Sequence, residues 1–90
     1  MNKESYKLIE SLFFKMLGFL QVAGLSDAHR EVARFFDVGE YGLAFEAALD
    51  GCINSGQPIP EKTKRMLECM AKTMEMDSSV LDGLYKVPDA

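Results

Sequence analysis

The residue types best suited to chemistry in this chain are one histidine and two cysteines, His29, Cys52 and Cys69. A structural zinc site needs about four such ligands, usually arranged in closely spaced pairs. The chain has no CxxC or HxxH pair, so we expect no metal site. His29 has no obvious nucleophile to activate, and we expect an ordinary surface or boundary histidine. Both cysteines have apolar neighbours at helical spacing, which predicts two buried core thiols.

Paired carboxylates are the second group that could do chemistry. Glu46 and Asp50 are four positions apart and therefore share one face of a helix. Carboxylate catalysis needs two such groups facing each other across a cleft, so this pair does not indicate an enzyme. The seven glycines are scattered and form no phosphate-binding loop. We therefore expect no cofactor.

The charge balance limits the class of partner. Fourteen acidic and ten basic residues give a formal net charge of −4 over 90 residues. A negative chain repels nucleic acid and anionic membrane, and it attracts a basic protein. The longest apolar-rich run, 12–23, contains Lys15 and Gln21 and is too short to span a bilayer. With no secretory signal visible, we expect a cytoplasmic protein.

The acidity is concentrated in residues 25–58, which contain six carboxylates and only two arginines. One interpretation is an ordinary solvated face. The other is an electronegative docking surface that speeds association with a basic partner. On the second interpretation, the predicted protein-binding residues are Glu31, Asp37, Glu40, Glu46 and Asp50.

Helices must position these residues, because apolar side chains recur every three or four positions along the chain. The spacing predicts helices over 2–23, 26–39, 40–53 and 60–75, followed by a short turn carrying Val80, Leu81 and Leu84. No alternating strand pattern competes. We expect an all-α fold, a compact bundle of four to five short helices. Residues 1–90 form one domain, with a frayed tail at 86–90.

Glycines and capping residues predict where these helices begin and end. Gly24 and Gly39 are placed as helix stops, Asn2 or Ser5 as the first N-cap, and Ser26 as the second. A glycine inside the first helix, Gly18, is expected to let a neighbour pack closely. The outer face of the fourth helix is expected to be basic, through Lys62, Lys64, Arg65 and Lys72. Its apolar face carries Met66, Leu67, Met70 and Met74, more typical of a core than of a peptide-binding groove.

The run from Phe35 to Asp50, FFDVGEYGLAFEAALD, followed by Ile59-Pro60 and a helix, resembles the MafI-like immunity proteins. These small bacterial proteins neutralise the toxic C-terminal domain of a secreted or surface-displayed polymorphic toxin. Immunity proteins of contact-dependent growth inhibition systems are often similar in size and acidity. The resemblance covers about 35 of the 90 residues and implies no particular toxin-contact residue.

Two functions follow from these observations. The first is an immunity protein that binds and neutralises a basic toxin domain, such as a nuclease, through an acidic surface. The alternative is a small helical adaptor or regulator unrelated to toxins. An enzyme or metal-binding protein would need an unseen use of His29 with Cys52 or Cys69. A homodimer also stays open, since a Phe- and Met-rich chain could bury part of an exposed apolar stripe.

Overall fold

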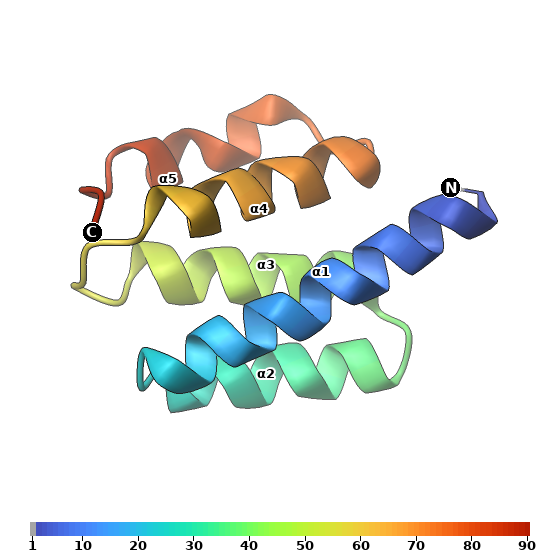
Figure 1. The fold of residues 1–90 in the computed structure, drawn as a ribbon, viewed down its shortest axis with the longest axis horizontal. Helices are drawn as coiled ribbons and strands as arrows, with labels where there is room; N and C mark the ends of the chain where they lie inside the picture. The colour runs from blue at the N-terminus through green and yellow to red at the C-terminus, as the bar shows by residue number, and fades with distance from the viewer. Residues whose placement is uncertain (1) are drawn as a thin grey trace.

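Five α-helices and one 3₁₀ turn make up the computed structural model, which describes residues 2–90 (Figure 1). No strand occurs in that range, and the all-α prediction is confirmed. The elements are α1 (Lys3–Val22), α2 (Ser26–Asp37), α3 (Tyr41–Ile53), α4 (Glu61–Thr73), the 3₁₀ turn η1 (Ser78–Leu81) and α5 (Asp82–Tyr85).

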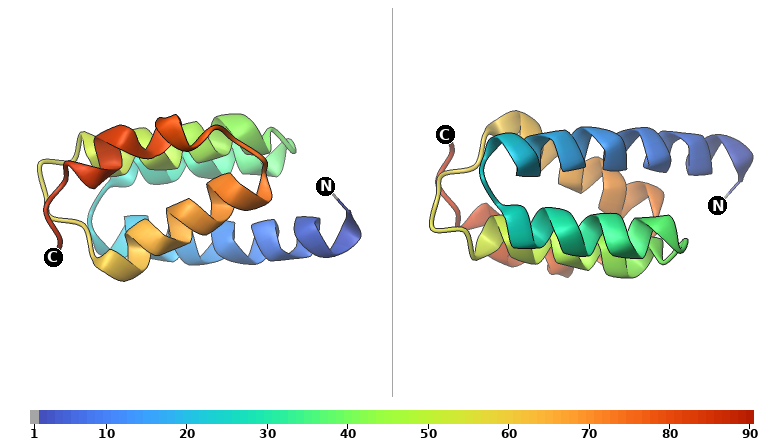
Figure 2. Two further views of the ribbon diagram at one scale, coloured as in Figure 1. Left: turned by 90° about the horizontal axis from the view of Figure 1, so that it is seen from above. Right: turned by 90° about the horizontal axis from the view of Figure 1, so that it is seen from below.

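The first three helices lie side by side, each antiparallel to its neighbour in sequence (Figures 1 and 2). Helix α2 packs most extensively against α3, and α1 lies across this pair. Helix α4 contacts both α1 and α3, and η1 with α5 covers α3 on the side away from α2. Helix α3 is therefore enclosed on several sides, while the outer face of the α2–α3 pair stays open.

The core is built from the apolar stripes that the helical spacing predicts. Ile9, Phe13, Met16 and Leu20 of α1 are fully buried and stand three or four positions apart. Phe45, Ala48 and Cys52 follow the same rule on α3, as do Leu67 and Met70 on α4. Burying a large apolar side chain contributes about 1.5–3 kcal/mol, so these stripes are what hold the bundle together.

The turns after α1 and α2 are closed by glycine. Gly24 and Gly39 have positive φ values of 74° and 77°, as predicted for helix stops. The amide after each glycine donates back into the helix, from Leu25 to Leu20 and from Glu40 to Phe35, both at 2.9 Å. This pattern satisfies carbonyls that the helix end leaves unpaired.

The N-caps agree with the prediction at α1 and differ at α2. Asn2 caps α1 by accepting a 2.8 Å hydrogen bond from the Ser5 amide. The N-cap position of α2 is Leu25, with no side-chain cap, and Ser26 is already helical. The prediction for Ser26 is therefore wrong. The glycine turn draws Leu25 close to α1, so α2 begins one residue earlier than a serine cap would allow.

Helix α4 ends with the same turn, but Glu75 occupies the position where α1 and α2 have glycine. Its φ is 57°, and the Met76 amide donates to the Ala71 carbonyl at 2.9 Å. A left-handed conformation costs an L-residue roughly 1–2 kcal/mol. Glu75→Gly should therefore raise the free energy of unfolding by about 0.5–1 kcal/mol, measured by urea denaturation. Lys72→Gly, inside the helix, is the control and should lower it by about 1 kcal/mol; equal changes in both variants would contradict the prediction.

The C-terminal tail is held against the start of α4, which differs from the expected fraying. The Ile59 amide donates to the Pro88 carbonyl at 2.9 Å, and the Ala90 amide donates to the Ile59 carbonyl at 3.1 Å. The Lys64 ammonium donates to the Val87 carbonyl and, at 2.7 Å, to the Asp89 carboxylate. Lys64 is therefore buried, and its placement on an exposed basic face was wrong. The tail returns to α4 and brings two hydrogen-bond acceptors to the Lys64 ammonium. The spacing of residues within α4 does not predict this contact.

The two cysteines have different environments. Cys52 is fully buried in α3, as predicted, whereas Cys69 is exposed on α4. The prediction for Cys69 is wrong because its flank of α4 faces away from the core. Burial raises the pKa of the Cys52 thiol from 9.0 to about 11, since a low-dielectric core disfavours the thiolate.

This raised pKa makes stability depend on alkaline pH. The folded state holds the Cys52 proton more tightly than the unfolded state does, so unfolding is favoured once the unfolded thiol ionises. The contribution is fully present below pH 9.0 and is lost as the pH rises through about 11. Urea unfolding over this range should show a steeper loss of stability in the wild type than in Cys52→Ala. Cys69→Ala keeps the buried thiol and should follow the wild type; parallel curves for all three chains would refute this assignment.

Candidate functional site

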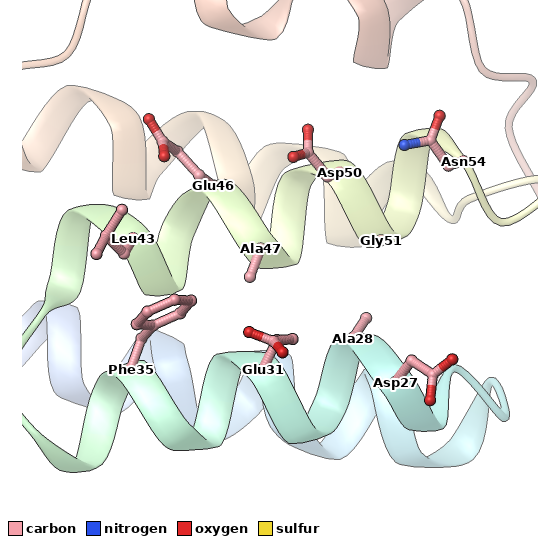
Figure 3. A pocket seen from close by; sticks show the side chains of 10 residues that line it. All are labelled: Asp27, Ala28, Glu31, Phe35, Leu43, Glu46, Ala47, Asp50, Gly51 and Asn54. Atoms are coloured by element: carbon pink, nitrogen blue, oxygen red, sulfur yellow. The ribbon is translucent and has the colours of Figure 1, made fainter.

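An open groove of about 560 Å³ runs along the seam between α2 and α3 (Figure 3). Its residues are Asp27, Ala28, Glu31 and Phe35 of α2, with Leu43, Glu46, Ala47, Asp50 and Gly51 of α3 and the adjoining Asn54. A second hollow of about 510 Å³ shares its Asp27–Asn54 end and continues to the turn after α1. Helix α1 lies behind the pair in this view, so the groove is on the outer face of the bundle.

Small residues form the floor of the groove. A Cβ atom added at Gly51 would lie 2.5 Å from the Ala28 Cβ, far inside van der Waals contact. The missing side chain therefore lets α2 and α3 approach closely, and Ala47 continues the shallow floor along α3 (Figure 3). Gly18 was expected to have this role, but nothing lies within 4 Å of a Cβ built there. That expectation was wrong because Gly18 is on the exposed side of α1.

The two ends of the groove differ in polarity. At one end Phe35 and Leu43 face each other across the seam (Figure 3). Leu43 is 44% exposed, and the Arg34 guanidinium lies 4.5 Å from the centre of the Phe35 ring. At the other end Asp27 and Asn54 close the groove. An occupant would therefore meet apolar surface at one end and polar groups at the other.

Four carboxylates stand along the groove, and they are not equally available. On α2, Asp27 pairs with Arg30 at 3.4 Å and Glu31 pairs with Arg34 at 2.7 Å. On α3, Glu46 and Asp50 are exposed and have no ion pair within the part of the chain that the structure describes. They form a row with Asn54 along the outer edge of α3 (Figure 3). The two groove carboxylates without an ion pair among the described residues are thus on its α3 side.

The structure brings together three of the five predicted binding residues. Glu31, Glu46 and Asp50 line the groove, whereas Asp37 ends α2 and Glu40 precedes α3, so both lie at the connecting turn outside its lining. Sequence reasoning missed Asp27, Phe35 and Leu43 as lining residues. Asp27, Glu31 and Phe35 are spaced by four, so a common face on α2 could have been read from their spacing. The part played by Leu43 and Gly51 depends on which face of α3 meets α2.

Other groups with shifted pKa values lie outside the groove. Tyr41 donates a 2.7 Å hydrogen bond to the Glu10 carboxylate, which raises the pKa of the phenol. Hydrogen bonds from Ser79 lower the pKa of Asp77, the residue that caps η1. Desolvation and a hydrogen bond to Glu68 raise the pKa of Tyr85. These contacts join or cap helices, and their role is structural.

His29 is partly buried on α2, in keeping with a boundary histidine. Within residues 2–90, no three histidine, cysteine or carboxylate side chains gather closely enough to hold a metal ion. None of the helices in the same range combines the length and apolar character that crossing a bilayer requires.

A smaller hollow of about 480 Å³ lies between α1 and α4. Phe19, Pro60 and Met66 give it an apolar lining, and its charged residues are Lys15 and Lys62. This hollow and the α2–α3 groove therefore carry opposite charge. Of the two, only the α2–α3 groove lies within the acidic segment 25–58.

Comparison with protein-family models, curated proteins and solved structures finds no match for this chain.

Proposed function

We propose that this chain is an immunity protein, which binds the toxic C-terminal domain of a secreted or surface-displayed bacterial toxin and neutralises it. The observation that carries the proposal is the acidic groove between α2 and α3. It combines an apolar floor, which gives affinity, with carboxylates at its edge, which give attraction and orientation. Such a site binds a partner without any chemistry of its own.

The location of the groove supports this proposal. The segment that resembles MafI-like immunity proteins runs from Phe35 to Asp50 and supplies half of the lining residues, Phe35, Leu43, Glu46, Ala47 and Asp50. The segment that carries the resemblance thus overlaps the groove at Phe35 of α2 and along α3.

The charge of the groove indicates what kind of toxin it fits. A nuclease domain carries basic residues where it binds its polyanionic substrate. Glu46 and Asp50, which have no cationic partner among the described residues, can take the place of that substrate's phosphates. Inhibition would then follow from occlusion of the basic surface, with association accelerated by opposite charge.

The test is a pull-down of the tagged chain from its native host at moderate salt, followed by a protection assay. We expect the C-terminal domain of a large secreted protein to be retained in near one-to-one ratio. Co-expression of this chain should then rescue cells that produce that domain. Retention of regulatory proteins alone, with no rescue, would replace the immunity function by that of a helical adaptor.

A further inference from the structure

We propose that the α2–α3 groove receives a basic α-helix of the partner, lying along the seam with an apolar side chain against Phe35 and Leu43. This inference rests on the proposed function, because it specifies the partner element that enters the same groove. The occupant is helical, cationic and anchored at one end.

The composition of the floor favours a helix over an extended segment. Ala28, Ala47 and Gly51 offer no polar side-chain atom, and the backbone of α2 and α3 is already hydrogen-bonded within each helix. An extended segment would leave its own amides and carbonyls unpaired against this floor. A helix satisfies its backbone internally and can pack its side-chain ridges into the seam at the usual interaxial distance of about 8–10 Å.

The spacing of the two α3 carboxylates that have no ion pair in the described part of the chain predicts the spacing of the basic residues on the partner helix. Glu46 and Asp50 stand one helical turn apart, about 6 Å along α3. Basic residues four positions apart on a partner helix have the same spacing and would face both carboxylates together. The carboxylates on α2 are already paired with Arg30 and Arg34. We therefore expect the α3 side of the groove to contribute more of the attraction than the α2 side.

The difference between the two ends gives the helix its position along the groove. Phe35 and Leu43 present apolar surface at the end near the α2–α3 turn (Figure 3). A leucine or phenylalanine of the partner would bury against them, and the cations would follow toward Asp50. An anchor of this kind fixes the register, which charge attraction alone does not do.

The test uses a synthetic alanine-rich peptide of about 15 residues, close to the shortest length at which an isolated helix is marginally stable. It carries two arginines four positions apart and one leucine on the same face. Binding to the full chain is followed by amide chemical shifts and by the helical circular dichroism of the peptide. We expect shifts concentrated on α2 and α3, together with a gain in peptide helicity.

Two control peptides separate shape from charge. A central Ala→Pro change keeps the charge but breaks the helix, and Leu→Ser removes the anchor. Each should bind about tenfold more weakly or worse. Equal binding of the proline peptide would overturn the helical occupant, and equal binding of the serine peptide would overturn the anchored register.

Variants of the chain itself test how charge and shape of the groove contribute to binding. Glu46→Gln with Asp50→Asn removes charge without changing shape and should weaken binding about tenfold. Asp37→Asn with Glu40→Gln makes the same charge change outside the groove and should leave binding nearly unchanged. Ala47→Leu fills the floor, leaves all charges in place and should also weaken binding. Equal affinity for all three variants would overturn the site.

The outcomes also separate this inference from the proposed function. A chain that protects cells from a toxin but does not bind the helical peptide would overturn the helix and leave the immunity function. A chain that binds the peptide but retains no toxin would overturn the immunity function and leave the helical occupant. If the groove resonances change on dilution without peptide, a second copy of the chain is the occupant and the inference fails.

Discussion

Reversing Glu46 and Asp50 to lysine is expected to slow association with the proposed toxin partner by about tenfold to a hundredfold at low ionic strength. These two carboxylates are exposed, lie on the edge of the groove and have no cationic partner within the described residues. Their negative potential acts on the approaching partner before contact. The association rate constant, measured by stopped flow at several salt concentrations, is the direct readout.

The matched control is Asp37→Lys with Glu40→Lys, which makes the same charge change at the α2–α3 turn. Lysine is favourable at the C-terminal end of α2 and unfavourable before α3, so the two effects on stability should largely cancel. We expect a smaller decrease in rate for this control. The decrease for the groove variant should shrink toward 0.15 M salt, where charges are screened beyond about 8 Å. Equal rates for the two double variants would show that the groove does not guide association.

Replacing Gly51 by alanine is expected to lower the free energy of unfolding by about 1–3 kcal/mol. The added Cβ would lie 2.5 Å from the Ala28 Cβ, so α2 and α3 would have to move apart. Their separation would disturb the most extensive helix–helix contact in the bundle. This range is the net change, because the cost of overpacking should exceed the gain of about 1 kcal/mol that alanine brings in helix propensity. Urea denaturation measures the difference.

Gly18→Ala provides a matched control, because Gly18 is also inside a helix but has nothing within 4 Å of an added Cβ. This variant should gain up to about 1 kcal/mol. In the double variant Gly51→Ala with Ala28→Gly, removing the opposing methyl group should restore much of the lost stability. A Gly51→Ala chain as stable as Gly18→Ala would mean that α2 and α3 separate without penalty.

The close approach at Gly51 also connects stability with the groove. A wider seam would deepen the floor between Ala28 and Ala47 and move the α3 carboxylates away from α2. We therefore expect Gly51→Ala to affect partner binding even though it changes no charge. The groove depends on the packing of the two helices as much as on the side chains along its edge.

Several features of this chain follow from local sequence alone. The buried stripes of α1, α3 and α4 follow from apolar spacing, and Asn2, Gly24 and Gly39 mark helix ends because their conformations are set by neighbouring residues. The concentration of carboxylates in residues 25–58 is likewise visible without a structure. These features depend on residues within a few positions of one another.

Other features depend on tertiary contacts between segments that are distant in the sequence. Lys64 is buried because the tail returns to it with Val87 and Asp89, and no pattern within α4 reveals that return. Gly51, rather than Gly18, permits close packing because Gly51 lies against Ala28 of α2. That same packing selects Glu31, Glu46 and Asp50 for the groove and leaves out Asp37 and Glu40. The sequence determined the helices and the sign of the charge, whereas tertiary contact decided which charges share a surface.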